Sequence, residues 1–317
     1  MASEQNVTKK QHYLPKAYLQ FFAHQERNKK KIYAYFTSEK TVRYVPIDDI
    51  CQKAYLYEQA IVFPEDPDTY MYAPNEIENS FIEAEGKYAS LVKRLIDETN
   101  NGNVVTLNNE ARRDLAQFMS SILYRSPVMV HIMNCFLRDE YSKHPNMFND
   151  IKSQDPDIPE SFFIAAYAHE LMSRLLNLFT RATCGITEQD QLVLFKTVSS
   201  VFVTSDHPVK NIYGENNGEE YNLIGMPITP HLFLAFVSVD TVLPPIITLD
   251  DEQVTRINER QLIGRPRYIL SDQEKLTEHI DVTKEIMLPE DCRLDTESLY
   301  DESDIAYYKK IMKSYRD

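Results

Sequence analysis

The apolar residues in the first half of the chain recur every three to four positions, which is the spacing of helices with one buried face. This spacing predicts long helices over residues 75–98, 108–124 and 160–183, the first two opened by asparagines that can cap a first turn. The third is apolar over most of its circumference, so we expect it to be central. A short helix is predicted over residues 14–23, because Pro15 suits a first helical turn.

Alternating tyrosine and β-branched residues predict strands elsewhere in the chain. Residues 31–36 and 41–45 flank a polar turn and predict a hairpin. In the second half, strands are predicted over residues 195–204, 223–228, 232–239 and 267–270, with a helix over residues 250–264. The polar, proline-containing residues 143–159 predict a long surface loop.

These elements predict an α+β fold in which a helix-rich first half packs against a small, largely antiparallel sheet. No internal repeat or clean linker divides the sequence, so we expect a single domain over residues 1–317. Its core is expected over residues 8–290. The tail, residues 291–317, predicts an amphipathic C-terminal helix over residues 301–316.

Charge and composition exclude several functional classes. The net charge of -14 repels phosphate backbones, so a nucleic acid is not the expected partner over most of the surface. No apolar run approaches the ~20 residues of a membrane span, and no secretion signal is visible, so no membrane partner is expected. The four cysteines are widely spaced, which fits reduced thiols in the cytoplasm. The seven glycines form neither a dinucleotide fingerprint nor a P-loop.

The most informative stretch is an apolar run over residues 199–203 that ends abruptly at Thr204-Ser205-Asp206-His207. Pro208 follows and cannot donate to a strand ladder, so the run must stop there. Polar side chains at the end of a rigid element are candidates for function. Asp206 can orient a histidine, hold a cation or act as a base; alternatively, it caps local N–H groups in an Asx-type turn. Ser205 lacks the Gly-x-Ser-x-Gly elbow of a serine hydrolase.

Gln11 and His12 immediately precede the short helix near the N-terminus. His12 can serve as a general base or a metal ligand near neutral pH. The alternative is that Gln11 or His12 caps the helix and packs against Tyr18.

Arg125 interrupts an apolar helical face just before a Ser-Pro pair. Its guanidinium can clamp a phosphate or carboxylate, or it can neutralise a buried Glu78 or Asp206. Glu78 and Glu85 are seven positions apart and therefore share a helical face. Such carboxylates can hold a divalent cation or divide acid and base roles, and the alternative is a solvated acidic face. We assign no metal ligand, and a divalent cation is the one cofactor these residues suggest.

The opening segment resembles the Gln-His-aromatic-x-Pro-x-x-Tyr-Leu-x-x-Phe motif of a bacterial family catalogued as domain of unknown function 4238. Further stretches that resemble this family are Glu78 with Glu85, Tyr124-Arg125-Ser126-Pro127, Thr204-Ser205-Asp206-His207-Pro208-Val209 and Met226-Pro227-Ile228-Thr229-Pro230. The resemblance spans residues 9–270, and His207 stands where the family often has asparagine. It implies a bacterial protein, and the position of some family members near defence genes suggests a defence-type effector.

Two functional hypotheses follow. The first is an intracellular hydrolase acting on a phosphodiester or nucleotide, with His12 as base, Arg125 stabilising charge, Asp206 orienting groups or binding a cation, and Glu78 assisting. In this hypothesis Gln11, Tyr18, Ser205 and His207 bind the substrate. The second is a ligand-sensing or protein-binding module in which the His/Arg/Asp set is a structural network.

Overall fold

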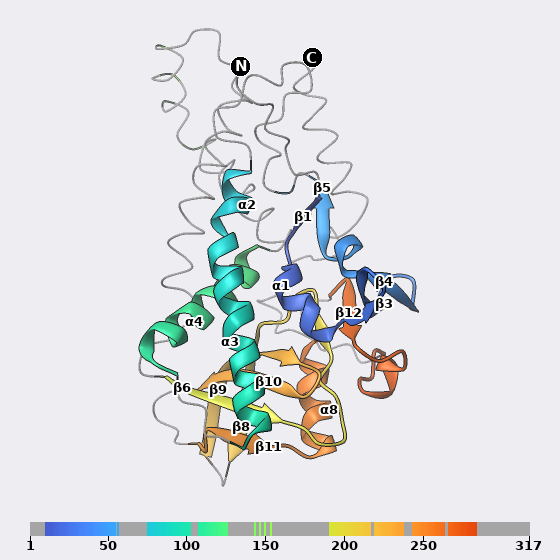
Figure 1. Ribbon diagram of the computed structural model, residues 1–317, viewed down its shortest axis with the longest axis vertical. Coiled ribbons are helices and arrows are strands. Elements are labelled where there is room, and N and C mark those ends of the chain that lie inside the picture. Colours follow the sequence, from blue (N-terminus) through green and yellow to red (C-terminus); the bar gives the residue numbers. More distant parts are fainter. Residues whose placement is uncertain are drawn as a thin grey trace.

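The computed structural model describes residues 10–54, 56, 75–102, 107–125, 190–216, 219–237, 243–263 and 266–283, with the single positions Lys143, Asn146, Asn149 and Ser153 (Figure 1). The helices predicted over residues 160–183 and 301–316 lie outside this part of the chain. The four single positions are helical and exposed, in place of the loop conformation predicted there. None of the described helices is long and apolar enough to cross a membrane.

The described helices of the first half are α1 (Lys16–Leu19), continued by the 3-10 turn η1 (Gln20–Phe22), α2 (Glu76–Ser80), α3 (Ile82–Asn100) and α4 (Asn109–Tyr124). Asn108 caps α4 as predicted, because its side chain accepts a hydrogen bond from the Ala111 N–H. Asn75 does not: it has a left-handed φ of 62° and makes no side-chain cap, so that part of the prediction is wrong. The single helix expected here is interrupted at Phe81, between α2 and α3.

The strands within the described ranges form two five-stranded sheets and a short ribbon. The first, the β6 sheet, has the order β11 (Ile246–Thr248), β6 (Gln191–Lys196), β10 (Leu232–Val237), β9 (Glu219–Thr229) and β8 (Lys210–Asn216). The second, the β3 sheet, has the order β2 (His24–Glu26), β3 (Lys29–Phe36), β12 (Tyr268–Ser271) and β7 (Thr204–Ser205), with β4 (Thr41–Pro46) also paired to β3. The ribbon pairs β1 (Lys10–His12) with β5 (Gln52–Ala54).

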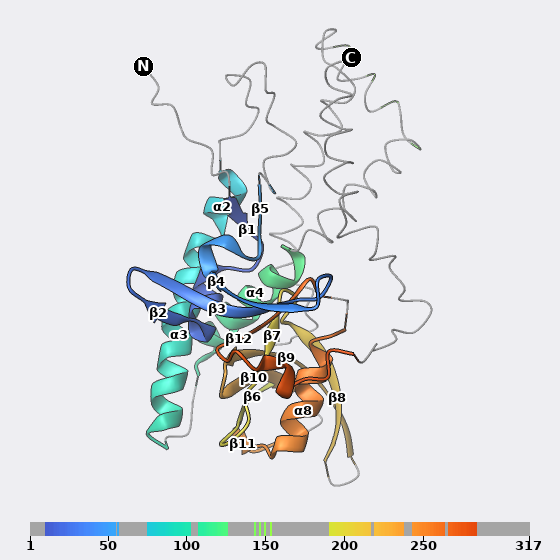
Figure 2. The same cartoon turned by 90° about the vertical axis from the view of Figure 1, so that its right-hand side faces the viewer.

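The predicted α+β class is confirmed, and the β3–β4 hairpin forms where the sequence indicates it. Among the described strand pairs only β11 with β6 is parallel, so the prediction of largely antiparallel pairing also holds. The β-structure is larger than one small sheet, and the hairpin of the first half joins β12 and β7 of the second (Figure 2). The 3-10 turns η2 (Ile47–Asp49) and η3 (Leu276–Glu278) and helix α8 (Asp251–Arg260) complete the described elements.

Val201, Phe202 and Val203, just before Thr204, are buried but do not form the strand that their composition predicts. The Phe202 N–H donates to the Pro230 carbonyl at 2.8 Å, and the Val203 N–H donates to the Asn258 side chain at 3.0 Å. Only Thr204 and Ser205 pair as a strand, β7, against β12. The polar segment Thr204-Ser205-Asp206-His207 therefore begins with a two-residue strand and is held by contacts from distant parts of the chain.

Asn258 on α8 ties three segments together and is buried. Its Oδ1 accepts from Val203 N, and its Nδ2 donates to the carbonyls of Val201 and His279 at 2.9 and 3.0 Å. We expect Asn258→Ala to lower the free energy of unfolding by about 2 kcal/mol, because it leaves buried backbone groups without partners. Urea unfolding measures this, and Thr255→Ala on the exposed face of α8 is the control. An equal, small effect of both substitutions would contradict the prediction.

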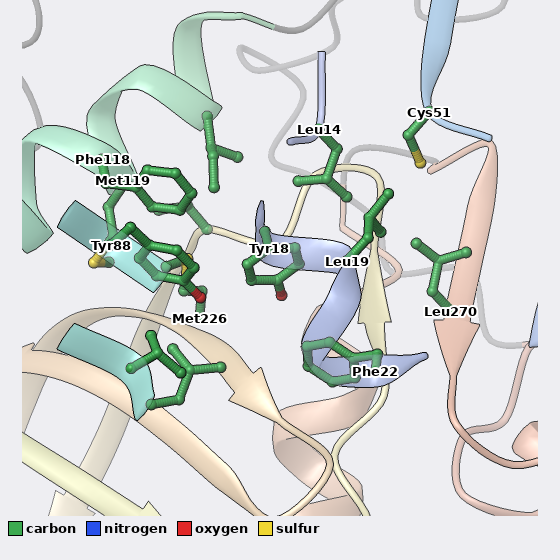
Figure 3. Close-up of a cluster of buried hydrophobic side chains, with 14 of the residues drawn as sticks. Leu14, Tyr18, Leu19, Phe22, Cys51, Tyr88, Phe118, Met119, Met226 and Leu270 are labelled. Atoms are coloured by element: carbon green, nitrogen blue, oxygen red, sulfur yellow. The ribbon is translucent and has the colours of Figure 1, made fainter. Parts of the chain in front are cut away.

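The aromatic core fixes the segment that follows His12. Tyr18 lies between the α3–α4 pair and the β-structure (Figure 3), and its hydroxyl donates to the Pro227 carbonyl at 2.7 Å and lies 2.6 Å from Thr204 Oγ1. Tyr88 of α3 stacks on Phe118 of α4 with ring centroids 3.7 Å apart. These fully buried rings anchor α1, and they thereby set the position of β1 just before it.

Candidate functional site

A continuous series of polar contacts joins helices α3 and α4 to β1 and to the end of β7. Arg125 Nη1 donates to Glu85 Oε1 at 2.6 Å, and Nη2 donates to the His12 carbonyl at 2.9 Å. The next residue, Tyr13, donates from its hydroxyl to Asp206 Oδ2 at 3.4 Å. We call Glu85, Arg125, His12, Tyr13 and Asp206 the polar chain. The structure thus brings three of the four predicted catalytic residues into one connected group.

Arg125 follows the last residue of α4 and is 1% exposed. Its guanidinium carbon lies 3.8 Å from the centroid of the Phe81 ring, which adds a cation–π contact to the ion pair with Glu85. The structure gives Arg125 a carboxylate partner on α3, Glu85, seven positions after the Glu78 that the sequence suggested. Glu78 lies on α2, partly buried, and its carbonyl accepts from the Phe81 N–H at 3.3 Å.

His12 ends β1, whose pairing with β5 places its ring beside η2. Ring nitrogen Nε2 lies 3.3 Å from the Ile47 carbonyl, and because a carbonyl can only accept, Nε2 carries the proton. Nδ1 is then the lone-pair nitrogen, and it has no hydrogen-bond partner among the described residues. Burial, reinforced by the charges of Lys16 and Arg125, lowers the pKa of His12 to about 4. The ring is therefore neutral at neutral pH, with a fixed tautomer.

Asp206 is 2% exposed, and its carboxylate faces the start of β12. The Arg267 N–H donates to Oδ1 at 3.1 Å and the Tyr268 N–H lies 3.5 Å from the same oxygen. Burial raises the pKa of Asp206 to about 6, although these N–H groups and the charges of Lys210 and Arg267 oppose the rise. Desolvation is thus the larger effect, and a carboxyl that titrates near neutral pH results.

The four residues predicted to bind substrate lie around this group, and the hydroxyls of Ser205 and Tyr18 make internal hydrogen bonds. Ser205 is buried and its hydroxyl donates to Gln261 Oε1 at 2.9 Å, while Tyr18 holds the core as described above. Burial raises the pKa of Tyr18 far above its usual value. Gln11 is buried on β1, and the partly exposed His207 follows Asp206. Burial and the Lys210 charge lower the pKa of His207.

Sequence reasoning missed several residues of this region. Glu85 was considered only as a partner of Glu78, and Tyr13 and Gln261 carried no motif that singles them out. Lys210 begins β8 next to the buried Val209, yet it is itself 7% exposed. Burial lowers the pKa of Lys210 to about 8, and the charge of Asp206 opposes part of that shift. A lysine directly after an apolar residue at a strand start gives no signal of burial in a single sequence.

The residues do not assemble a cation site. No group of three or more His, Cys, Asp or Glu side chains in the described part of the chain is arranged to hold a metal ion. Of the carboxylate pair that suggested a divalent cation, Glu85 binds the Arg125 guanidinium. We therefore derive no step that passes through a metal.

Comparison with protein-family models decides the relationship of this chain. The model described as protein of unknown function (DUF4238) matches residues 10–275. The chain belongs to the DUF4238 family. Neither the curated proteins nor the solved structures contain a significant match. The matched range includes every residue of the polar chain, so the polar chain lies within the DUF4238 region.

Proposed function

We propose that this DUF4238 protein is an intracellular hydrolase of a phosphodiester or nucleotide substrate, with His12 as its general base. The observation that carries the proposal is the fixed tautomer of His12: the Ile47 carbonyl holds the Nε2 proton and leaves Nδ1 as an acceptor. Its lowered pKa keeps the ring in the basic form at neutral pH. Groups with strongly shifted pKa values gather at functional sites, and His12, Asp206 and Lys210 are such groups.

In this proposal, His12 Nδ1 accepts a proton from water as the water oxygen bonds to phosphorus. The bond from phosphorus to the leaving oxygen breaks, and that oxygen takes up the proton that His12 has accepted. Arg125 acts through the His12 carbonyl as a positioning residue, because its charge is already paired with Glu85. Asp206 holds Tyr13, the residue next to His12, and Glu78 is an auxiliary carboxylate. Ser205 and Tyr18 shape the site from within, while Gln11 and His207 border it.

The wider setting is also proposed. A bacterial cytoplasmic location fits the buried free thiol of Cys51 and the acidic composition. A defence-type effector role is proposed with it, and loss of toxicity in the His12 variant described next tests that role in cells.

The test is a screen of nucleotide and phosphodiester hydrolysis with and without Mg²⁺ or Mn²⁺. We expect His12→Gln to lower kcat/KM about a hundredfold, which is the lower end for loss of a general base because a pKa near 4 makes a weak one. Glutamine keeps an Nε2 donor for the Ile47 carbonyl, so the melting temperature should be nearly unchanged. His24→Gln is the matched control, since the exposed His24 also directs Nε2 at a carbonyl, that of Asp272. Equal activity of wild type and His12→Gln would refute the role of His12.

The alternative is a ligand-sensing or protein-binding module in which the polar chain is structural. It is favoured by the burial of Arg125 and Asp206, at 1% and 2% exposure, and by the hydrogen bonds each makes within the protein. A satisfied, buried network rigidifies a fold without performing chemistry. This hypothesis predicts no hydrolysis of any screened substrate by the wild type and a large stability loss in both the His12 and the Asp206 variants.

A further inference from the structure

Lys210 is a buried ammonium with most of its hydrogen-bonding capacity unused. Its Nζ donates to the Ile263 carbonyl at 2.7 Å, and this is its one hydrogen-bond acceptor among the described residues. An ammonium group carries three N–H donors. At 7% exposure the side chain has lost nearly all its water, and two of its three donors have no acceptor among the described residues.

The nearest compensating charge is Asp206, and it does not supply those partners. Asp206 and Lys210 lie on either side of Pro208 and each shifts the pKa of the other. Yet within the described residues no ion pair of 4.0 Å or less joins them, and the Asp206 oxygens accept from Arg267 N, Tyr268 N and Tyr13. The charges of Lys210 and Asp206 therefore interact at a distance, and no direct contact between them neutralises the Lys210 charge.

We propose that Lys210 binds the phosphoryl group of a ligand at this point, between the end of β7 and the start of β8. Lysine binds phosphate as a compact point charge, whereas planar recognition of carboxylates favours arginine. In a chain of net charge -14, a buried cation that forms no ion pair with a described carboxylate is a local attractor for an anion. The inference rests on the proposed function only in assigning that phosphoryl group to a substrate.

A purely structural role for Lys210 makes a different prediction. Ile263 closes the turn after α8, so Lys210 can serve as a cation that stabilises the carbonyl end of that helix. If this were its function, replacing the lysine would lower the melting temperature. A ligand-binding lysine costs stability in the free protein, so Lys210→Met, which keeps the apolar stem, should leave the melting temperature unchanged or raise it.

The experiment measures the melting temperature of the full chain against inorganic phosphate, with sodium chloride at matched ionic strength as the reference. We expect the wild type to gain stability with the logarithm of phosphate concentration. The Lys210→Met variant should lose this gain, with phosphate affinity weakened by about tenfold or more, as for loss of a hydrogen bond to a charged group. Lys93→Met, an exposed lysine on α3, should respond as the wild type does.

Two results overturn the inference: no phosphate-specific gain in the wild type, or an undiminished gain in Lys210→Met. If Lys210→Met does not fold, acetylation of the wild type followed by mass spectrometry decides instead. Phosphate should then slow acetylation of Lys210 and leave acetylation of Lys93 unaffected. Equal rates of Lys210 acetylation with and without phosphate would overturn the inference.

Phosphate binding is measured without turnover, so it is separable from the hydrolase proposal. The His12→Gln variant should retain the phosphate response even where it has lost hydrolysis. Hydrolysis without a Lys210-dependent phosphate response would leave the proposed function in place and remove only this site. A Lys210-dependent phosphate response in a protein without hydrolase activity would keep this phosphate site and remove the proposed function.

Discussion

Replacing Arg125 with methionine is expected to lower the free energy of unfolding by roughly 3–5 kcal/mol, the usual cost of removing one partner of a buried ion pair. Three contacts are lost together: the ion pair with Glu85, the bond to the His12 carbonyl and the stacking on Phe81. The Glu85 side chain retains 26% exposure and can be partly solvated, which places the effect toward the lower end of that range. The His12 carbonyl loses its only guanidinium donor, so β1 should be loosened as well.

Urea unfolding followed by circular dichroism measures this change, provided the slope with denaturant is the same in both proteins. Arg94→Met is the control, since Arg94 pairs with Glu98 on the exposed face of α3 and such pairs contribute about 0.3–0.5 kcal/mol. Combining Arg125→Met with Glu85→Met should recover part of the loss, because the unpaired carboxylate is then removed. A loss no larger than that of Arg94→Met would show that Arg125 does not hold the helices to β1.

Local signals in the sequence were sufficient for much of the fold. The β3–β4 hairpin follows from alternation around a polar turn, and α4 begins at the asparagine that caps it. Helix α8 begins after Asp250, with a capping box that includes Gln253. In each case the residues that decide the structure lie within a few positions of one another.

The predictions from sequence fail where contacts between segments far apart in the chain determine the local structure. The run before Thr204 has strand composition, but the Asn258 side chain, 55 positions from Val203, takes the N–H that a neighbouring strand would have used. Periodicity likewise placed Glu78 and Glu85 on one helical face, but the pairing of Glu85 with Arg125 depends on the packing of α4 against α3. The site residues were recognised as types of side chain, while their pairing depends on tertiary contacts.

Asp206→Asn is expected to raise the free energy of unfolding relative to the wild type at neutral pH, because the buried Asp206 carboxylate destabilises the folded protein when it is charged. Burial raises the pKa of Asp206 from 3.8 to about 6, so between these values the folded protein binds a proton more tightly than the unfolded chain does. The unfolding free energy of the wild type therefore falls as the pH rises through this window. Asparagine mimics the protonated form and lacks this dependence. From pH 4 to pH 7, the variant should gain roughly 2 kcal/mol relative to the wild type, since one pKa unit corresponds to about 1.4 kcal/mol and part of the effect is already present at pH 4.

Urea unfolding of both proteins at several pH values between 4 and 7 gives this difference directly. The window stops at pH 7 because loss of the Asp206 charge removes the interaction that keeps the pKa of Lys210 from falling further. Asp49→Asn is a control of opposite sign: the hydrogen bond from Lys10 lowers the pKa of Asp49, so that variant should lose stability relative to the wild type as the pH rises. Asp206→Asn could instead lose stability relative to the wild type as the pH rises, as expected for Asp49→Asn. That result would show that the N–H donors stabilise the charged Asp206 carboxylate, and it would indicate a structural role for Asp206. If Asp206→Asn gains stability and loses hydrolysis, the charged Asp206 carboxylate is needed for activity even though it destabilises the fold.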